Sequence, residues 1–403
     1  MRGSIKTFII TLLISFVSCS KYEVSEDLGI NTSELLPNNI TTSLPVININ
    51  VDNNDFITMM NNYEDDVKIL GSLSMFNASD TILFSDSIKL NIKGNGSAIF
   101  DLKSLSVKFH HSINNEKHKV IEVDKHLPTH FLKKLKKISL RNSGNDCEET
   151  FIKDICYTDL AISQALDIEL SYYRPVQVFV NNSFYGLLNL RTEKNDDALS
   201  KLLEVDKHEL NIIKINSING YEDVELKDGD DDIMLAFSED VYSNNLENLK
   251  LKVDINSFVD YVVFQDIIGN SDWPSNNVEL YSVGTGKFRF FLFDMDLVSI
   301  DDKFFVLEDS NVGFIYEMYK TLIQDNDISS LIKKRQKEIF NYCTNERFHA
   351  IVDKNANVIE HEIDYNISKY GLENGHVRWY LDIEKMLDQY KIRRENYKKH
   401  YNL

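Results

Sequence analysis

Residues 255–296, INSFVDYVVFQDIIGNSDWPSNNVELYSVGTGKFRFFLFDMD, decide how the second half of this chain is built. The apolar positions of 255–268 predict a helix. A Gly-Asn start and a Trp-Pro bend predict a loop over 269–277, and 278–293 predicts a β-hairpin that ends beside acidic residues. This order places a polar loop and the acidic end of an apolar strand close together in the sequence.

Both polar segments carry residues that suit chemistry on phosphate. Asp272 and Asn277 have the spacing of the catalytic Asp and the metal-binding Asn in protein kinases. Asp294 and Asp296 follow the apolar strand two positions apart, so we expect them on one face of it. Carboxylate and amide oxygens are ligands that Mg²⁺ prefers, and Mn²⁺ is an alternative. The pattern favours metal-dependent phosphoryl transfer.

A plainer interpretation of the loop pair stays open. The same spacing recurs at Asp86/Asn91, Asp206/Asn211 and Asp240/Asn245, so a polar loop that caps a helix would also explain it. Trp273 is open in the same way, because it could pack near a nucleotide or in the core. Asp296 could be a second metal ligand or a carboxylate that orders the first.

The first half of the chain is rich in short alternating apolar runs. These predict strands at 45–51, 67–76, 86–94 and 103–111 and a hairpin over 174–190. Residues 148–166 predict a helix that carries Glu148, Glu149 and Asp154. Residues 195–250 predict short helices with an acidic loop at 228–232, and the chain from 313 onward predicts mostly helices. The expected fold class is α+β, with a β-rich lobe followed by a mainly helical lobe, which is the plan of a kinase.

A glycine-bearing turn joins two of the predicted strands. It reads KGNGS, and its members are Lys93, Gly94, Asn95, Gly96 and Ser97. Glycines would let backbone N–H groups approach phosphates, although Gly-Asn-Gly is also a good tight turn. Lys103 begins the next predicted strand, and kinases pair such a lysine with a helix acid.

Composition excludes several classes of protein. The chain has 403 residues, 43% of them hydrophobic and only 5 of them Pro, so most of it should be globular. Its net charge of −19 argues against nucleic acid as a partner. Three cysteines follow Cys19, and we expect Cys147, Cys156 and Cys343 to be buried free thiols.

The N-terminus is typical of a secretory signal. Arg2 and Lys6 precede a short apolar run at 8–17, and FVSCS ends in a small residue before Cys19, as in the lipobox of bacterial lipoproteins. An ordinary signal peptide with an incidental cysteine is the alternative. We expect residues 1–19 to be a signal, 20–44 to be a flexible tether, and the mature chain to be lipid-anchored outside the cytoplasm, at an outer membrane or cell surface.

Six collinear blocks resemble one family. They are LPVININVDNNDFI (44–57), LNIKGNGSAIFDLKSLSVKF (90–109), NDCEETFIKDICYTDLA (145–161), PVQVFVNNSFYGLLNLRTEKND (175–196), INSFVDYVVFQDIIGNSDWPSNNVELYS (255–282) and FRFFLFDMDL (288–297). In this order they resemble the spore coat protein H (CotH) kinase family of secreted atypical protein kinases. The final MLDQYKIRRENYKKHY (386–401) is similar to the closing helix of that family.

The resemblance implies a diverged two-lobed kinase fold, with an N-lobe at 45–193 and a C-lobe at 194–403. It implies ATP-dependent phosphorylation of Ser/Thr in a protein of the cell envelope, with Mg²⁺. The site residues that it implies are Lys103, Glu193, Asp272, Asn277, Asp294 and Asp296. This chain departs from the family pattern at Lys93, Leu102 and Phe293, which replace an Arg, a Lys and a Trp. Two alternatives remain, namely a binding module that keeps the fold and a phosphotransferase that acts on a glycan or small molecule.

Overall fold

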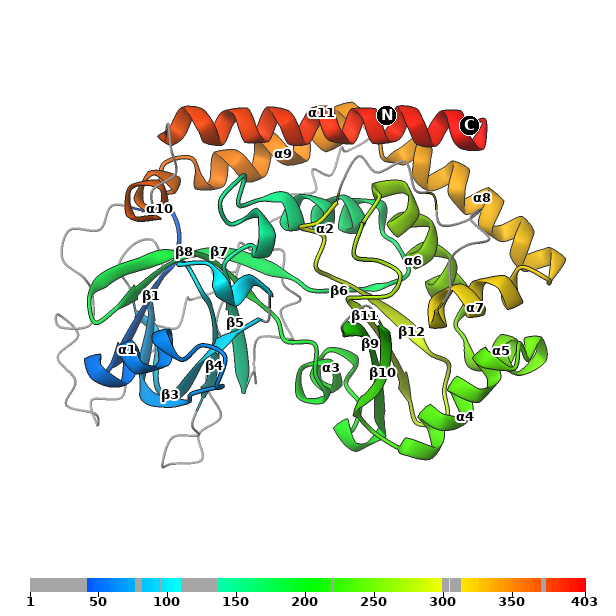
Figure 1. The fold of residues 1–403 in the computed structure, drawn as a ribbon, viewed down its shortest axis with the longest axis horizontal. Helices are drawn as coiled ribbons and strands as arrows, with labels where there is room; N and C mark the ends of the chain where they lie inside the picture. Colours follow the sequence, from blue (N-terminus) through cyan, green and yellow to red (C-terminus); the bar gives the residue numbers. More distant parts are fainter. Residues whose placement is uncertain are drawn as a thin grey trace, which may run out of the picture.

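The computed structural model describes residues 42–76, 82–94, 96–109, 136–218, 221–298, 304, 313–370 and 375–403. Within these residues the chain forms a closed β-barrel, a second sheet beside it, and helices that lie across the top of both (Figure 1). The predicted α+β class, with a β-rich first part and a helical last part, is therefore confirmed.

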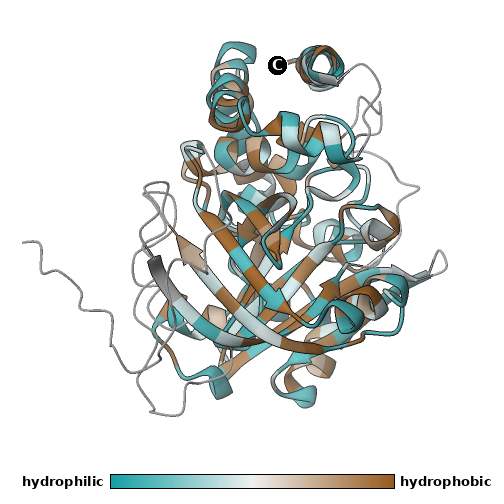
Figure 2. Ribbon diagram, turned by 90° about the vertical axis from the view of Figure 1, so that its left-hand side faces the viewer, coloured by the Kyte–Doolittle hydropathy of each residue, from teal (hydrophilic) through white to brown (hydrophobic). Residues whose placement is uncertain are grey.

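The barrel has the strand order β1-β2-β3-β4-β5-β8-β7. It closes because β1 pairs with β2 in the antiparallel sense and with β7 in the parallel sense. Ile47 and Ile49 of β1 belong to the main core, whereas Val46 packs in a small cluster with Phe76 and Phe179. Hydrophobic and hydrophilic residues accordingly succeed one another along the strands (Figure 2). The barrel strands are β1 (Val46–Val51), β2 (Ile69–Phe76), β3 (Ile82–Lys93), β4 (Ser104–Phe109), β5 (Lys137–Arg141), β7 (Tyr173–Val180) and β8 (Ser183–Arg191).

The second sheet has the order β10-β9-β11-β12-β6. Its pairs are antiparallel except that β12 runs parallel to the short β6, whose chain position lies between the barrel strands. Its strands are β6 (Glu169–Leu170), β9 (Leu210–Ile218), β10 (Tyr221–Asp228), β11 (Val278–Val283) and β12 (Arg289–Leu292).

The long C-terminal helix α11 (Gly375–Tyr401) connects the two halves of the molecule (Figure 1). The indole N–H of Trp379 donates to the carbonyl oxygen of Thr150, which precedes α2, at 2.8 Å. Further along, Arg393 donates to carbonyl oxygens at the end of α6. The other helices are α1 (Asn53–Asn61), α2 (Lys153–Gln164), α3 (Asp196–Leu203), α4 (Asp231–Tyr242), α5 (Leu246–Lys252), α6 (Ile255–Ile268), α7 (Phe314–Leu322), α8 (Asn326–Tyr342), α9 (Asn345–Ile359) and α10 (Ile363–Tyr370), with 3-10 turns η3 (Gly96–Ile99), η5 (Gly144–Asp146) and η6 (Lys207–Glu209).

Most of the predicted elements are confirmed. Helix α6 has the predicted bounds, and β7/β8 and β11/β12 form the two predicted hairpins. Cys147, Cys156 and Cys343 are buried free thiols, as expected.

Two predictions were right only in part. The helix expected over 148–166 begins only at Lys153, because the Asp146 carboxylate binds the N–H groups of Thr150 and Lys153 and Phe151 adopts a positive φ. Residues 195–250 contain the hairpin β9/β10 as well as short helices. Asn-Gly at 219–220, between two alternating runs, was the sequence signal for this hairpin.

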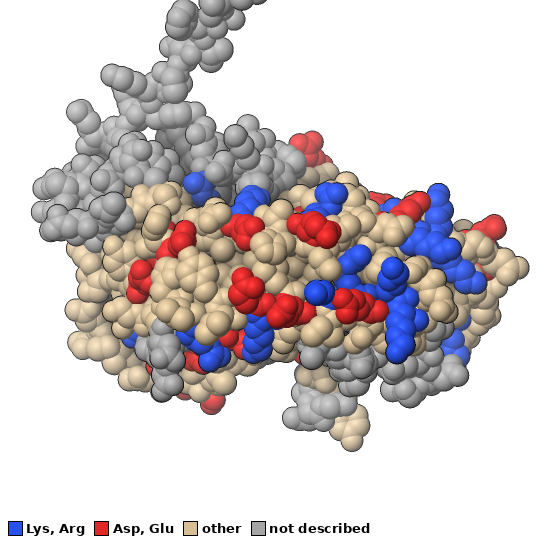
Figure 3. Space-filling model, turned by 90° about the horizontal axis from the view of Figure 1, so that it is seen from above, with Lys and Arg blue, Asp and Glu red and all other residues tan. Residues whose placement is uncertain are grey.

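Charge is distributed unevenly over the upper face of the molecule. Seen from above, basic side chains gather at the end that carries α8 and the C-terminal half of α11 (Figure 3).

The predicted signal at 1–19, Cys19 and most of the predicted tether at 20–44 lie outside the described residues. Among the helices that the structure describes, none is long and apolar enough to cross a membrane.

Candidate functional site

The loop after α6 brings the first predicted pair together. Gly269 ends α6 with a φ of 70°, which turns the chain into the loop. One Asp272 carboxylate oxygen accepts hydrogen bonds from the side-chain N–H groups of Asn277 at 2.8 Å and Asn276 at 3.3 Å. The Asn276 amide oxygen accepts from the backbone N–H of Ser217 at 3.2 Å, which fixes the loop to β9. The loop is therefore an ordered arrangement around the Asp272 carboxylate.

Asp294 and Asp296 meet at one guanidinium group. They lie beyond the end of β12 rather than on it, and Asp294 has a φ of 61°, so the expectation of a shared strand face was wrong. Arg141 nonetheless contacts both carboxylates through the same nitrogen, Nη2, at 3.3 Å from Asp296 Oδ2 and closer still to Asp294 Oδ1. The Asp296 oxygen also accepts from the backbone N–H of Asn145 at 2.7 Å.

An ion-pair network continues from Arg141 into α2. The Asp154 carboxylate, in the first turn of α2, accepts from Arg191 Nη2 at 2.5 Å and lies 3.8 Å from Arg141 Nε. Its other oxygen accepts from the backbone N–H of Met295 at 3.1 Å. Asp154 therefore joins two arginines of the barrel to the segment between the two acidic residues.

Sequence reasoning missed Arg141, Arg191 and Asn145 as members of this site. Each of them contacts the acidic segment or Asp154 only because folding brings it there. The one available signal was a charged residue at the end of the apolar run KISLR (137–141).

The pKa values of the three acids show that they share one electrostatic environment. Burial raises the pKa of Asp272, and the negative charge of Asp294 raises it further. Burial also raises the pKa of Asp296, and Asp294 adds to this effect. Burial opposes ionisation of Asp294 too, but the positive charges of Arg141 and Lys194 outweigh it, so the pKa of Asp294 is lowered. Asp294 is thus the carboxylate that stays charged, and its field reaches both neighbours.

The glycine-bearing turn brings a second predicted pair together. Lys93 Nζ lies 2.8 Å from both carboxylate oxygens of Glu193. Gly94 has a φ of 103°, where a side chain would be strained and would crowd Ser97 Oγ. Gly96 and Ser97 begin the 3-10 turn η3, and Asn95 lies outside the described residues.

Lys103 does not contact a helix acid. It is buried just before β4, and its ammonium group donates to the carbonyl oxygens of Ala98 at 2.6 Å and Phe100 at 3.0 Å. Among the helix acids, Asp154 pairs with the arginines described above, and Glu149 pairs with Lys153 and Lys385. The pair expected between Lys103 and a helix acid is therefore not formed among the described residues, because carbonyls of its own turn bind Lys103.

Trp273 packs in the core. It is buried, belongs to the main hydrophobic cluster, and meets Tyr261 edge to face with ring centroids 6.2 Å apart. Of the two interpretations that the sequence left open for Trp273, the structure favours core packing.

The donor atoms at the acidic end fit a hard cation such as Mg²⁺. Asp294 and Asp296 supply carboxylate oxygens, and Asn277, whose amide nitrogen binds Asp272, would use its amide oxygen. Across the described ranges, no group of three or more His, Cys, Asp or Glu side chains is arranged to hold a metal ion. The Arg141 guanidinium contacts both carboxylates that a metal would need, those of Asp294 and Asp296.

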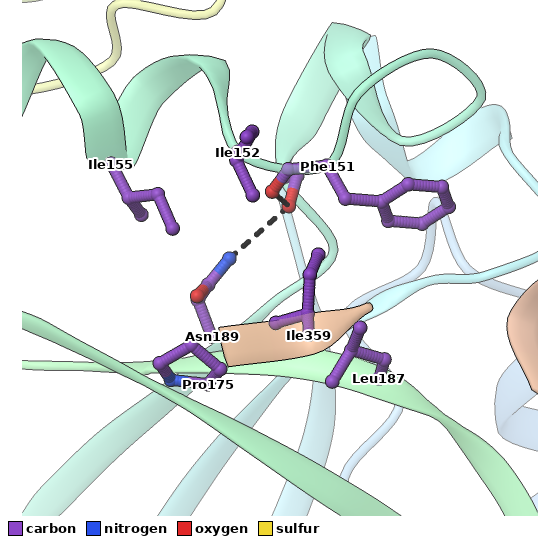
Figure 4. A pocket seen from close by; sticks show the side chains of 8 residues that line it. Phe151, Ile152, Ile155, Pro175, Leu187, Asn189 and Ile359 are labelled. Atoms are coloured by element: carbon purple, nitrogen blue, oxygen red, sulfur yellow. Dashed lines mark hydrogen bonds between the residues drawn. The ribbon is translucent and has the colours of Figure 1, made fainter. Parts of the chain in front are cut away.

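A small pocket elsewhere does not coincide with these residues. It is lined by Ser143, Phe151, Ile152, Ile155, Pro175, Leu187, Asn189 and Ile359 (Figure 4). Its polar atoms bind each other: Asn189 donates to Ser143 Oγ at 3.1 Å, and that hydroxyl donates to the Phe151 carbonyl oxygen at 2.8 Å. The pocket is therefore a packing feature between the start of α2 and strands β7 and β8.

Comparison with known proteins places this geometry in context. A family model described as CotH kinase protein matches residues 90–397, which includes the glycine-bearing turn, the Asp272 loop and the acidic segment. No curated protein matches the chain.

Proposed function

Because the chain belongs to the CotH kinase protein family, and is therefore kinase-like, we propose that it transfers the γ-phosphate of ATP to Ser/Thr hydroxyls of a protein outside the cytoplasm. The observation that carries this proposal is the contact between the Asp272 loop and the acidic segment, where Ser271 donates from its N–H and its hydroxyl to the Leu297 carbonyl oxygen, next to the Arg141 pairs with Asp294 and Asp296. This arrangement combines two carboxylates with different properties. Asp272 has a raised pKa, which suits a proton acceptor, and Asp294 has a lowered pKa, which keeps it charged.

In the proposed reaction, Asp272 is the general base. The acceptor hydroxyl oxygen forms a bond to the γ-phosphorus, the bond between that phosphorus and the β,γ-bridging oxygen breaks, and ADP leaves. The hydroxyl proton passes to Asp272, whose raised pKa makes it a better proton acceptor. Asn276 and Asn277 hold this carboxylate in one orientation.

Asn277 and Asp294 are the proposed magnesium ligands, with Asp296 beside them. A bound Mg²⁺ or Mn²⁺ would neutralise phosphate charge. Asp296 is tied to the Asn145 N–H, which suits a carboxylate that orients the segment.

The barrel and the second sheet correspond, in this proposal, to the N-lobe (45–193) and C-lobe (194–403) of a diverged kinase. Two features support the correspondence. Arg141 at the end of a barrel strand faces Asp154 in the first turn of α2, where kinases have a strand lysine and a helix glutamate. Asp294 follows an apolar strand of the second sheet, as a metal-binding Asp does.

The test is transfer of radiolabelled phosphate from ATP to proteins of an envelope extract. We expect Asp272→Asn to abolish transfer with little loss of ATP binding, because the base acts on the acceptor, whereas Asp294→Asn should lose both. Asp353→Asn is the matched control, since Asp353 is exposed on α9 and pairs with the exposed His349. Binding of ATP by the wild-type protein without any turnover would instead favour the binding-module alternative.

The proposed location depends on Cys19. If this cysteine carries a lipid, Cys19→Ala should move the protein from the membrane fraction to the soluble fraction. Unchanged partitioning into detergent would contradict a lipid anchor.

A further inference from the structure

Two buried glutamates each hold a pair of lysines. Glu193 binds Lys93 at 2.8 Å and lies 4.0 Å from Lys137. Glu279 binds Lys227 at 3.0 Å and lies 4.0 Å from Lys194. The Glu193 and Glu279 side chains are only 8% and 2% exposed, so both carboxylates act as fixed internal anchors.

The two groups form one cluster between the barrel and the second sheet. Glu193 and Lys194 are consecutive, and the Lys227 ammonium donates to the backbone carbonyl of Lys194. Burial lowers the pKa of Lys93, and the positive charges of Lys137 and Lys227 lower it further. Lys93 and Lys137 come from barrel strands, whereas Lys227 and Glu279 come from β10 and β11.

This cluster carries more positive than negative charge. Its four lysines outnumber its two glutamates, in a chain whose net charge is −19. The lysine side chains are 22–38% exposed, so each is partly open to solvent. One Glu279 oxygen is buried without a hydrogen-bond partner among the described residues, and this carboxylate therefore does not use its full capacity to hold the two lysines.

The cluster leads directly to the acidic site. The Lys194 ammonium lies over the ring of Phe293, the residue before Asp294, and its charge is one of those that lower the pKa of Asp294. We propose that Lys194 and Lys227, with Lys93 and Lys137 beside them, bind the phosphate chain of the nucleotide. This inference rests on the proposed function. It replaces Lys103, whose ammonium is bound to two carbonyl oxygens, as the main phosphate-binding cation.

The experiment measures binding of inorganic tripolyphosphate to the whole protein by calorimetry in metal-free buffer at fixed ionic strength. Lys194→Met and Lys227→Met should each weaken binding at least tenfold, and Lys227→Arg should restore most of it because the charge is kept. Lys334→Met is the matched control, because Lys334 is 69% exposed on α8 and pairs with the exposed Glu338. Lys103→Met, if folded, should bind nearly as well as wild type.

A second variant tests the cluster without removing a cation. Glu279→Gln frees Lys194 and Lys227 from a competing carboxylate, so tripolyphosphate should bind several-fold more tightly. Unchanged tripolyphosphate binding in a folded Lys194→Met/Lys227→Met double variant would overturn the inference. So would a single-stranded oligonucleotide that bound the wild-type protein as tightly as tripolyphosphate does. Because tripolyphosphate binding needs no turnover, it can fail while phosphate transfer from ATP persists, and it can hold in a protein that transfers nothing.

Discussion

Gly144 lies against the acidic segment, and its missing side chain lets Asp296 approach the backbone. Its φ is 64°, in the left-handed region that glycine enters without strain. A Cβ built there would overlap the Asp296 carboxylate and crowd Arg141 Nη2. The bond from Asn145 N–H to Asp296 therefore depends on glycine at the preceding position.

Replacing this glycine should destabilise the protein more than its backbone angle alone explains. Gly284 has a similar φ of 55°, but a Cβ there meets nothing within 4 Å, so Gly284→Ala measures the backbone cost alone, roughly 1–2 kcal/mol. Gly144→Ala should lower the free energy of unfolding by about 1–3 kcal/mol more, because Asp296 must move. Urea denaturation of both variants gives the difference. Equal losses in the free energy of unfolding would mean that Asp296 can move away at no cost.

Lys194 gives a prediction about pH. Burial lowers its pKa to about 7, although Glu279 opposes the shift and Lys227, Asp294 and Lys93 also act on it. Below pH 7 the folded protein must bury a charged ammonium, whereas the unfolded chain keeps it hydrated up to its ordinary pKa near 10.5. Lys194→Met should therefore stabilise the protein most below pH 7. The gain should fall as pH rises from 7 toward 10.5, by up to about 1.4 kcal/mol per pH unit.

Melting curves of wild type and Lys194→Met between pH 6 and 10 check this sign. Lys334→Met should shift the melting temperature by the same small amount at every pH, because its side chain is mostly exposed. A stabilisation by Lys194→Met that grew with pH would contradict the lowered pKa.

The residues of the site were predictable to different degrees. The pairing of Asp272 with Asn277 followed from local spacing, since both belong to one loop. The role of Arg141 did not, because Asp294 lies 153 positions away and only the closed barrel and β12 bring the two together. The expected pairing of Lys103 with a helix acid failed for a different reason: its position beside a strand was right, but carbonyls of its own turn bind the ammonium group.

At the scale of elements, local patterning decided what could be predicted. Helix α6 is buried on all sides and bounded by Asp254 and Gly269, so its bounds could be predicted from the sequence. Strand β10 consists of exposed and half-buried residues, many of them acidic, and its strand character comes from pairing with β9. Such a strand is specified by its partner more than by its own residues.

The start of α2 is the element boundary on which the acidic site depends most. Asp146 is fully buried, and its carboxylate accepts from Thr150 N–H, Thr150 Oγ1 and Lys153 N–H at 2.6–3.0 Å. These bonds end the turn before α2 and place Asp154 in its first turn, where it holds Met295.

Removal of this buried cap should therefore be costly. Asp146→Ala leaves Lys153, 3.7 Å from the carboxylate, and several donors without their acceptor, so we expect a loss of about 3 kcal/mol in the free energy of unfolding. Asp52→Ala is the matched control, because Asp52 caps the exposed start of α1 and should cost about 1 kcal/mol. Chemical denaturation compares the two, and hydrogen exchange should show faster exchange at Thr150 and Lys153 in Asp146→Ala. Equal losses in the two variants would contradict the special role of Asp146.

At the scale of the whole molecule, α11 restrains the parts that form the site. Trp379 holds the turn before α2, and Arg393 lies against the end of α6, directly before the loop that carries Asp272. One helix thus holds both the turn before α2 and the end of α6, although it is far from both in sequence. A ligand that orders the site should therefore raise the free energy of unfolding of the whole protein.

The site in its present arrangement holds carboxylates that repel one another, and Arg141 and Lys194 offset this repulsion only in part. If Mg²⁺ and ATP bind there together, they relieve the repulsion and bind only the folded state, so at a hundredfold excess over Kd they should add roughly 2.7 kcal/mol to the free energy of unfolding. For a chain of this size, the melting temperature should rise by a few degrees. The rise should require both components, because a metal held by Asp294 would neutralise the phosphate charge of ATP, and it should vanish in Asp294→Asn but persist in Asp353→Asn. If millimolar Mg²⁺ and ATP together did not change the melting temperature, Arg141 would remain the partner of Asp294 and Asp296. That result would favour the binding-module alternative over the kinase.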